Sequence, residues 1–294
     1  MVKLSSESIT QSDIERYLSD FSDFSFELQV LKKFVDLGFG CSHGGTYEDP
    51  VTSKSREYDI RALLQKGVIR VHLSVECKNF RDNSPLVVYC LKRKENESYN
   101  ELIHSFDPYS DHRILFTQYK LRDDAYSDNI RVQRYSLYAK EQFVAKSVDQ
   151  IEKRQDGEFT KSTDGKVFDK ISQAINSAID LISEANYLDT DTSHGGNNSP
   201  GYLTFVCPVL VIPDSSLWQA KYSDDGERIG EPERINHISY YIGKKWTVGN
   251  EPNLLHYTLS HLEIVTYSEI QNFVEKYLGD YITLCSAKIG GEFS

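Results

Sequence analysis

The strongest constraint on the fold lies in residues 57–78, EYDIRALLQKGVIRVHLSVECK, which alternate as two consecutive β-strands do. In the second strand Ile69, Val71, Leu73, Val75 and Cys77 alternate with Arg70, His72, Ser74, Glu76 and Lys78, the period of a half-buried strand. In the first strand Asp59 and Arg61 fall opposite the apolar set of Tyr58, Ile60, Ala62 and Leu64. The short linker 65–67 predicts a hairpin, which would bring Asp59, Glu76 and Lys78 together at one end of a sheet.

Two carboxylates and an ammonium at one point suit a divalent cation. Mg²⁺ prefers hard oxygens, and proteins typically hold it with one or two carboxylates plus substrate phosphate. A neighbouring lysine can orient the attacking water while the metal offsets the charge that develops on the phosphate. The alternative is a solvated strand face on which Asp59, Glu76 and Lys78 make an ordinary cross-strand ion pair. Spacing alone favours that alternative.

A third carboxylate, Glu27, strengthens the case for a site. In residues 20–37, the apolar residues Phe24, Val30, Leu31 and Phe34 lie three, four and seven positions from Glu27, so Glu27 is on the apolar face of an amphipathic helix. A carboxylate there should be protonated, paired or bound to a metal. The other interpretation is a first-turn glutamate that complements the helix dipole after Ser22 or Asp23 as cap.

These segments together resemble a known family. Glu27 is followed by Gly38-Phe39, by DPVTSKSREYDI at 49–60, and by VECKN at 75–79 with Pro85 six residues later. This order is similar to that of the PD-(D/E)xK, or restriction-endonuclease-like, nuclease superfamily, and most of all to its Mrr-like branch. Tyr58 stands where the proline of the motif name would be, and the resemblance covers about residues 20–90.

The resemblance implies a role for each matching position. Asp59 and Glu76 would be metal ligands, the Cys77 carbonyl a backbone ligand, and Lys78 the catalytic lysine. Glu27 would support the metal site or bind a second cation. The implied cofactor is Mg²⁺, with Mn²⁺ as a substitute, and the implied substrate is DNA. His43, in the turn-rich loop expected at 41–55, could reach the site, although an exposed loop histidine is the commoner outcome.

The composition is compatible with a nuclease but does not single one out. The chain has 294 residues, of which 39% are hydrophobic, and a formal net charge of -11. An acidic chain is not expected to coat nucleic acid nonspecifically, because such proteins carry basic surfaces. A local basic groove remains compatible with this charge. Its candidates are 92–94 and 131–140, and both runs could equally be solvated edges.

Other patterns exclude several classes of protein. The five cysteines are scattered without a CxxC pair, so the spacing predicts neither a zinc site nor a disulfide framework. No apolar run reaches the length of a membrane span, and the N-terminus lacks an apolar signal core. We therefore expect a cytoplasmic protein. No GxxxxGK[ST] loop is present, which argues against an ATP-driven motor.

The remaining pattern predicts an α/β fold: a restriction-endonuclease-like core with a mixed β-sheet flanked by helices, extended by a C-terminal α/β half. We expect a helix within 161–187, one at 268–278 and strands at 86–91, 202–212, 217–222, 237–242 and 261–266. A charged loop at 223–233 joins two of these strands, and Pro208 marks a bulge or an edge. No linker or repeat divides the chain, so residues 1–294 are expected to form one elaborated domain, with its core signature at 20–90 and its C-terminal extension at 161–280.

The resulting hypothesis is a Mg²⁺-dependent endonuclease that hydrolyses DNA in defence or restriction. A homodimer, or a partner protein of a defence system, fits this hypothesis, because one such site cleaves one strand at a time. Two alternatives stay open. The first is a catalytically inactive nucleic-acid-binding or scaffold protein on the same fold. The second is a small-molecule or nucleotide-processing enzyme, which the acidic charge favours.

Overall fold

The two alternating strands at 57–78 form the antiparallel hairpin on which the candidate site is built. Strands β4 (Ile60–Lys66) and β5 (Ile69–Cys77) pair from Ile60 opposite Val75 to Lys66 opposite Ile69. Gly67 closes the turn with a φ of 58°, a left-handed conformation that glycine adopts without steric cost. The computed structural model describes residues 6–20, 22–67, 69–80, 83–97, 100–105, 130–135, 142–154, 156–161, 166–188, 202–248 and 255–279.

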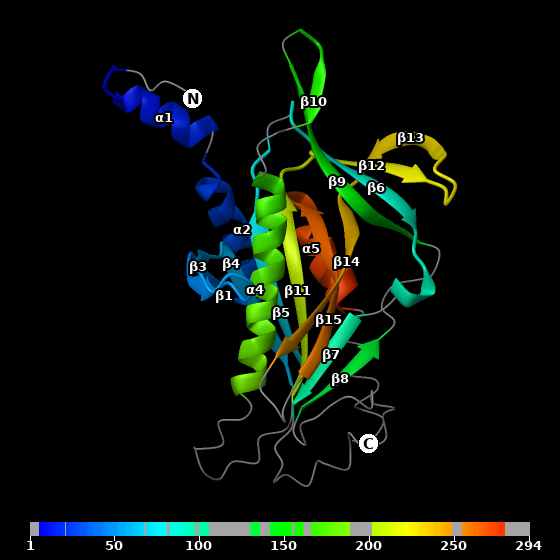
Figure 1. The fold of residues 1–294 in the computed structure, drawn as a ribbon. Helices are drawn as coiled ribbons and strands as arrows, with labels where there is room; N and C mark the ends of the chain where they lie inside the picture. The colour runs from blue at the N-terminus through cyan, green and yellow to red at the C-terminus, as the bar shows by residue number, and fades with distance from the viewer. Residues whose placement is uncertain are drawn as a thin grey trace.

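This hairpin belongs to a large mixed sheet that draws strands from both halves of the chain (Figure 1). Within the described residues, ten strands form its main path, in the order β1 (Gly40–His43), β4, β5, β11 (Tyr202–Ile212), β15 (Leu255–Thr266), β14 (His237–Val248), β9 (Phe143–Lys153), β6 (Leu86–Lys92), β12 (Leu217–Tyr222) and β13 (Arg228–Arg234). Three more strands attach to this path, namely β7 (Asn100–Ser105), β8 (Ile130–Tyr135) and β10 (Phe159–Lys161). A separate pair consists of β2 (Thr46–Glu48) and β3 (Ser55–Glu57).

Helices cover both faces of the sheet near β5 and β11. On one face lie α2 (Phe24–Asp36) and a C-terminal helical run made of η2 (Tyr267–Glu269), α5 (Ile270–Asn272) and η3 (Phe273–Leu278). On the other face lies α4 (Lys166–Leu188), which crosses in front of β5 and β11 in Figure 1. Two further helices are α1 (Gln11–Asp20) and η1 (Glu95–Glu97). The observed architecture is therefore a mixed α/β fold with a large mixed sheet and few flanking helices.

The apolar residues of β5 face α2, whereas the polar ones face α4. Ile69, Val71, Leu73, Val75 and Cys77 are buried in one core with α2 residues Val30 and Phe34. Phe24, which the sequence pattern assigns to the buried helix face, is instead exposed, and Phe26 is buried in its place. The alternation predicted for β5 is confirmed, and it directs Glu76 toward the underside of α4.

Pro208 is not at a sheet edge, contrary to the expectation. It lies inside β11, which pairs in parallel with β5 from Leu203 to Val211 without a bulge. On its other side, β11 pairs with β7 at Tyr202–Thr204 and with β15 at Val209–Ile212. Pro208 therefore lies between the part of β11 that pairs with β7 and the part that pairs with β15. Proline has no N–H to donate to a neighbouring strand, and at this position none is required.

Two expected loops contain strands. The segment at 41–55 includes most of β1, which pairs with β4, and all of β2, which pairs with β3. The charged loop at 223–233 includes most of β13, which pairs with β12 although its residues are all exposed and carry no apolar alternation. Charged residues on an exposed edge strand also discourage pairing with other chains.

Arg61 fixes α4 against the hairpin. Its guanidinium donates to Asp180 Oδ2 at 2.6 Å, to Glu184 Oε1 at 3.0 Å and to Ser177 Oγ at 3.2 Å, all on α4. The ring of Tyr58 stacks on the same guanidinium at 4.4 Å. These bonds set the position of α4 relative to β4, so the residues in the first turns of α4 lie over the ends of β4 and β5.

Candidate functional site

Asp59 and Glu76 meet at the end of the hairpin, as the alternation predicts. Asp59 directly precedes β4, and its Oδ2 accepts the backbone N–H of Cys77 at 2.8 Å. Its own N–H reaches Glu76 Oε1 at 3.4 Å. The Asp59 side chain is 12% exposed and that of Glu76 is 1% exposed. Backbone contacts thus hold both carboxylates in a largely buried position.

The ammonium that binds these carboxylates comes from Lys170 on α4. Lys170 Nζ donates to Asp59 Oδ1 and Oδ2, each at 2.7 Å, and to Glu76 Oε2 at 3.0 Å. Lys170 is 94 residues from Glu76 in sequence. Sequence reasoning missed it, although its position three residues after the buried Val167 and four before the buried Ala174 places it on the apolar face of its helix. The criterion that singled out Glu27 would also have found Lys170.

Lys78 is placed differently from the expectation. Its Nζ donates to Asp23 Oδ2 at 2.6 Å, and Asp23 Oδ1 accepts the backbone N–H of Asn79 at 3.0 Å. Asp23 is the residue before α2, so this pair joins the start of α2 to the segment that follows β5. The catalytic role that the resemblance implies for Lys78 would require its ammonium to leave Asp23.

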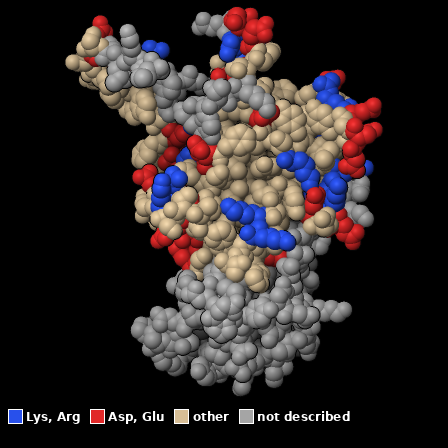
Figure 2. Space-filling view, in the orientation of Figure 1, with Lys and Arg blue, Asp and Glu red and all other residues tan. Residues whose placement is uncertain are grey.

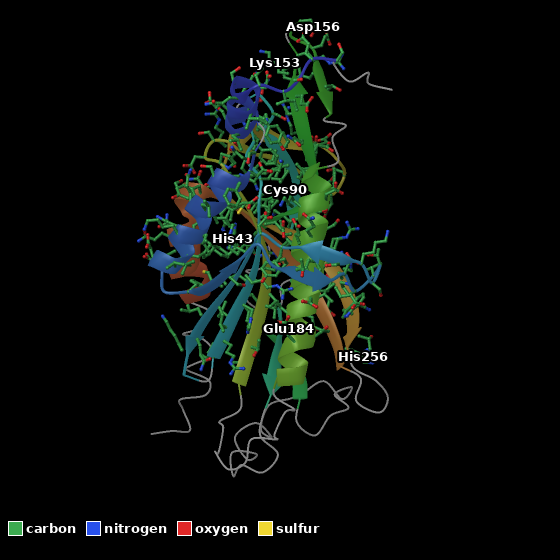
Figure 3. All side chains as sticks on the ribbon, turned by 90° about the vertical axis from the view of Figure 1, so that its left-hand side faces the viewer. His43, Cys90, Lys153, Asp156, Glu184 and His256 are labelled. Carbon is green, nitrogen blue, oxygen red and sulfur yellow. The ribbon has the colours of Figure 1, made fainter. Side chains whose placement is uncertain are left out.

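Glu27 lies in the first turn of α2 and is also drawn toward the site. Its Oε2 is 3.4 Å from His43 Nε2, and the two side chains are 16% and 21% exposed. Figure 3 places His43 beside α2. Burial raises the pKa of Glu27, the charge of Asp59 raises it further, and Lys170 and His43 act in the opposite direction. Glu27 is therefore a first-turn residue of α2, as one interpretation expects, and it also lies within electrostatic reach of Asp59.

Burial and neighbouring charge act strongly on the pKa of Glu76. Burial, followed by the charge of Asp59, raises the pKa of Glu76 to about 8, against the pull of Lys170. Burial lowers the pKa of Lys170, but the charges and hydrogen bonds of Glu76 and Asp59 outweigh it, so the net direction is upward. The Lys170 ammonium therefore stays charged, and the Glu76 carboxyl binds its proton more tightly than a free carboxyl does.

This arrangement predicts a pH dependence of stability. The ordinary pKa of Glu76 is 4.5 and its folded value is about 8. The folded protein binds the Glu76 proton more tightly, so this stabilisation is complete below the ordinary pKa and is lost as the pH rises toward 8. We expect the free energy of unfolding of the metal-free protein to fall across that window, and Glu76→Gln to flatten the decline.

Urea unfolding at several pH values, with a chelator present, measures this decline. Glu57→Gln, on the exposed strand β3, makes the same chemical change away from the site and should keep the native slope. An unchanged slope in Glu76→Gln would contradict the assigned pKa.

Asp59 and Glu76 offer oxygen donors for the cation that the resemblance implies. Within the described part of the chain, no three His, Cys, Asp or Glu side chains are grouped so as to hold a metal ion. Asp59 and Glu76 alone supply a pair of hard oxygen donors, which is the number that Mg²⁺ commonly takes from protein before water and phosphate complete its shell. The donor chemistry therefore fits Mg²⁺, provided that the ammonium of Lys170 moves.

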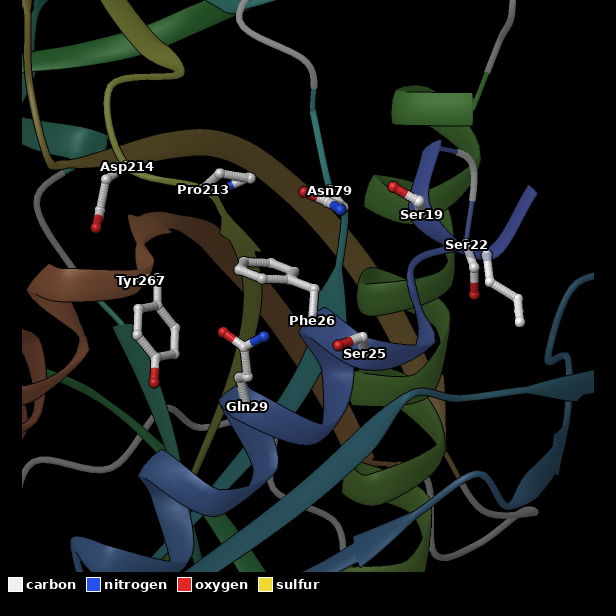
Figure 4. Close-up of a pocket in the computed structure, with 10 residues that line it drawn as sticks. Ser19, Ser22, Ser25, Phe26, Gln29, Asn79, Pro213, Asp214 and Tyr267 are labelled. Carbon is white, nitrogen blue, oxygen red and sulfur yellow. The ribbon is translucent and has the colours of Figure 1, made fainter. Parts of the chain in front are cut away.

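A hollow lies at the end of the sheet where Asp59 and Glu76 meet, on the face that α2 covers. This hollow of about 390 Å³ opens between α1, the start of α2 and the segments that follow β5, β11 and β15 (Figure 4). Polar side chains from these segments surround the rings of Phe26 and Tyr267, whose centroids are 6.1 Å apart. Asn79 and Ser22 in its lining adjoin the pair of Lys78 and Asp23.

The basic runs proposed from sequence are only partly on the surface. Lys92 and Lys94 are exposed, but Arg93 is 2% exposed, so it is not available to a phosphate backbone. The side chains of 131–140 lie outside the described residues. Figure 2 views the molecule from the α4 side, and there the Lys and Arg of the described residues form separate groups rather than one continuous groove.

In the part of the chain that the structure describes, no helix is both long and apolar enough to cross a membrane.

Comparison with known proteins adds no identification. No protein-family model matches the chain, and neither a curated protein nor a solved structure matches it.

Proposed function

We propose that this chain is a metal-dependent nuclease that hydrolyses phosphodiester bonds in DNA. The observation that carries the proposal is the convergence of Asp59 and Glu76 on one cationic group at the end of a hairpin. The order of a helix followed by two strands, which the resemblance implies, agrees with α2, β4 and β5 and supports the proposal. From the motif resemblance alone, we also propose that the core is restriction-endonuclease-like. On the same basis we propose that the protein acts in the cytoplasm, in defence or restriction.

Each residue has a physical task in this proposal. The N–H of Cys77 orients Asp59, and the burial of Glu76 fixes its carboxyl beside it. These two residues would hold Mg²⁺, with the Cys77 carbonyl as a further ligand and Glu27 near enough to add negative charge. The bound ion would stabilise charge on the phosphate and lower the pKa of a coordinated water. Lys78 and Lys170 are the two ammonium groups that can orient that water.

Cleavage of supercoiled plasmid tests the proposal and separates the two lysines. Methylated and unmethylated plasmid should be nicked with Mg²⁺ or Mn²⁺ and remain intact with a chelator. If Lys170 orients the water, Lys170→Ala should reduce the nicking rate about a hundredfold or more, as expected for a positioned proton-transfer group. Lys78→Ala should then reduce the rate much less. The reverse ranking would restore the role that the motif implies for Lys78.

One observation favours a second function. The ammonium of Lys170 already satisfies both carboxylates without any metal. A protein that keeps this ion pair permanently would be an inactive DNA-binding or scaffold protein on the same fold. Absence of cleavage on either plasmid, with either metal, together with retained duplex binding that weakens steeply with salt, would favour this function.

A further inference from the structure

The ammonium of Lys170 is fully hydrogen-bonded by the carboxylates of Asp59 and Glu76. An ammonium has three protons, and Lys170 Nζ has three acceptors, at 2.7, 2.7 and 3.0 Å. Both oxygens of Asp59 and one oxygen of Glu76 therefore point at the same atom. The Lys170 side chain is 18% exposed, so this contact is shielded from water and from salt.

A divalent ion cannot share this position with the ammonium. Mg²⁺ binds oxygen at about 2.0–2.1 Å, so an ion held by Asp59 and Glu76 must occupy the space where Nζ lies. Two cations in that space would also repel each other strongly in a largely buried environment. Ion and ammonium are therefore mutually exclusive partners of the carboxylates.

Lys170 can leave without disturbing its helix. The helix is anchored elsewhere, through the bonds of Asp180 and Ser177 to Arg61 and through the buried side chains of Ile171 and Ala174. The four-carbon stem of a lysine is flexible, so rotation about its bonds can move Nζ while the backbone of α4 stays in place.

From this geometry we propose that Lys170 is the occupant of the cation position in the metal-free protein, and that a divalent ion binds only by displacing it. The inference rests on the proposed metal-dependent function and deepens it. Lys170 is then a positioning residue that holds the Asp59 and Glu76 carboxyl groups together before the ion arrives. Metal affinity is reduced by the free energy needed to break three charge-assisted hydrogen bonds.

Metal binding tests the proposal without any reference to cleavage. Titration calorimetry with Mn²⁺ alone would compare the native protein with Lys170→Met, which keeps an unbranched side chain but removes the competing charge. Lys78→Met is the matched control, because it removes the same charge from an ammonium bound to Asp23. We expect at least about a tenfold gain in affinity for Lys170→Met, worth about 1.4 kcal/mol, and a much smaller change for Lys78→Met.

The native protein provides a second measurement that needs no variant. The ¹⁵Nζ signal of Lys170 should show an ammonium protected by hydrogen bonds in the metal-free state and lose that protection when Mg²⁺ saturates the site. The signal of Lys78 should stay in place. Persistent protection of Lys170 with Mg²⁺ bound, or equal Mn²⁺ affinities of Lys170→Met and the native protein, would overturn displacement while leaving the nuclease proposal intact. If neither protein binds Mn²⁺, both proposals fail.

Discussion

Replacing Asp59 with asparagine is expected to reduce plasmid cleavage at least about a thousandfold, because a bound metal contributes several kcal/mol to transition-state stabilisation and each 1.36 kcal/mol is a factor of ten. Asparagine keeps an oxygen that can accept the Cys77 N–H, now at 2.8 Å from Asp59 Oδ2. The fold should therefore survive while the charge that holds a cation is lost. Initial rates of nicking with Mg²⁺ and with Mn²⁺, at equal protein concentration, measure the effect.

Glu57→Gln supplies the control for this variant. Glu57 is two residues before Asp59, lies on the exposed strand β3, and loses its charge in the same way. Its cleavage rate should remain within a few-fold of the native rate. If Asp59→Asn, shown to be folded by circular dichroism, cuts within tenfold of the native chain, Asp59 does not bind the catalytic ion.

The largest expected effect on stability is that of Phe205→Ala. Phe205 lies in β11 opposite Val71 of β5 and is 1% exposed in the core between α2 and the sheet. Removing a buried phenyl ring loses its transfer free energy and leaves a cavity, so the free energy of unfolding should fall by about 3–5 kcal/mol. Urea denaturation followed by tryptophan fluorescence or circular dichroism gives this value.

Phe159→Ala is the matched comparison for Phe205→Ala. Phe159 lies on β10, is 67% exposed and has Lys153 over its ring at 5.9 Å. Its removal should cost less than about 1 kcal/mol. Losses of similar size for the two variants would mean that β11 is not the centre of a packed core in solution.

The local sequence pattern was sufficient to predict the hairpin and the positions of its two carboxylates. The alternation within 57–78 has a period of two, and a short turn leaves one register that buries the apolar set. Asp59 and Glu76 consequently had to meet at the hairpin end, as they do through the 3.4 Å contact of the Asp59 N–H with Glu76. The bounds of β11 also match the predicted strand at 202–212, because a long apolar run has few alternatives to a central strand.

Edges of the sheet were harder to predict. The strand β13 consists of exposed residues, and the backbone ladder with β12 holds it although its side chains contribute no apolar signal. The residues of β3 are likewise all exposed, and its pairing with β2 depends on the turn between them. In such segments the hydrogen bonds of the main chain decide the structure, and these bonds are nearly independent of side-chain type.

What the sequence determined by itself is that Asp59 and Glu76 share one face at one end of a hairpin, and that Glu27 is a charged residue on an apolar helix face. Only the tertiary structure decided which ammonium reaches the carboxylates. Lys78 lies beyond the last residue of β5 and is close enough to Asp23 to pair with it, whereas Arg61 sets α4 so that Lys170 reaches Asp59 and Glu76. Ion pairs between distant segments depend on helix placement, and helix placement follows from packing that no local spacing encodes.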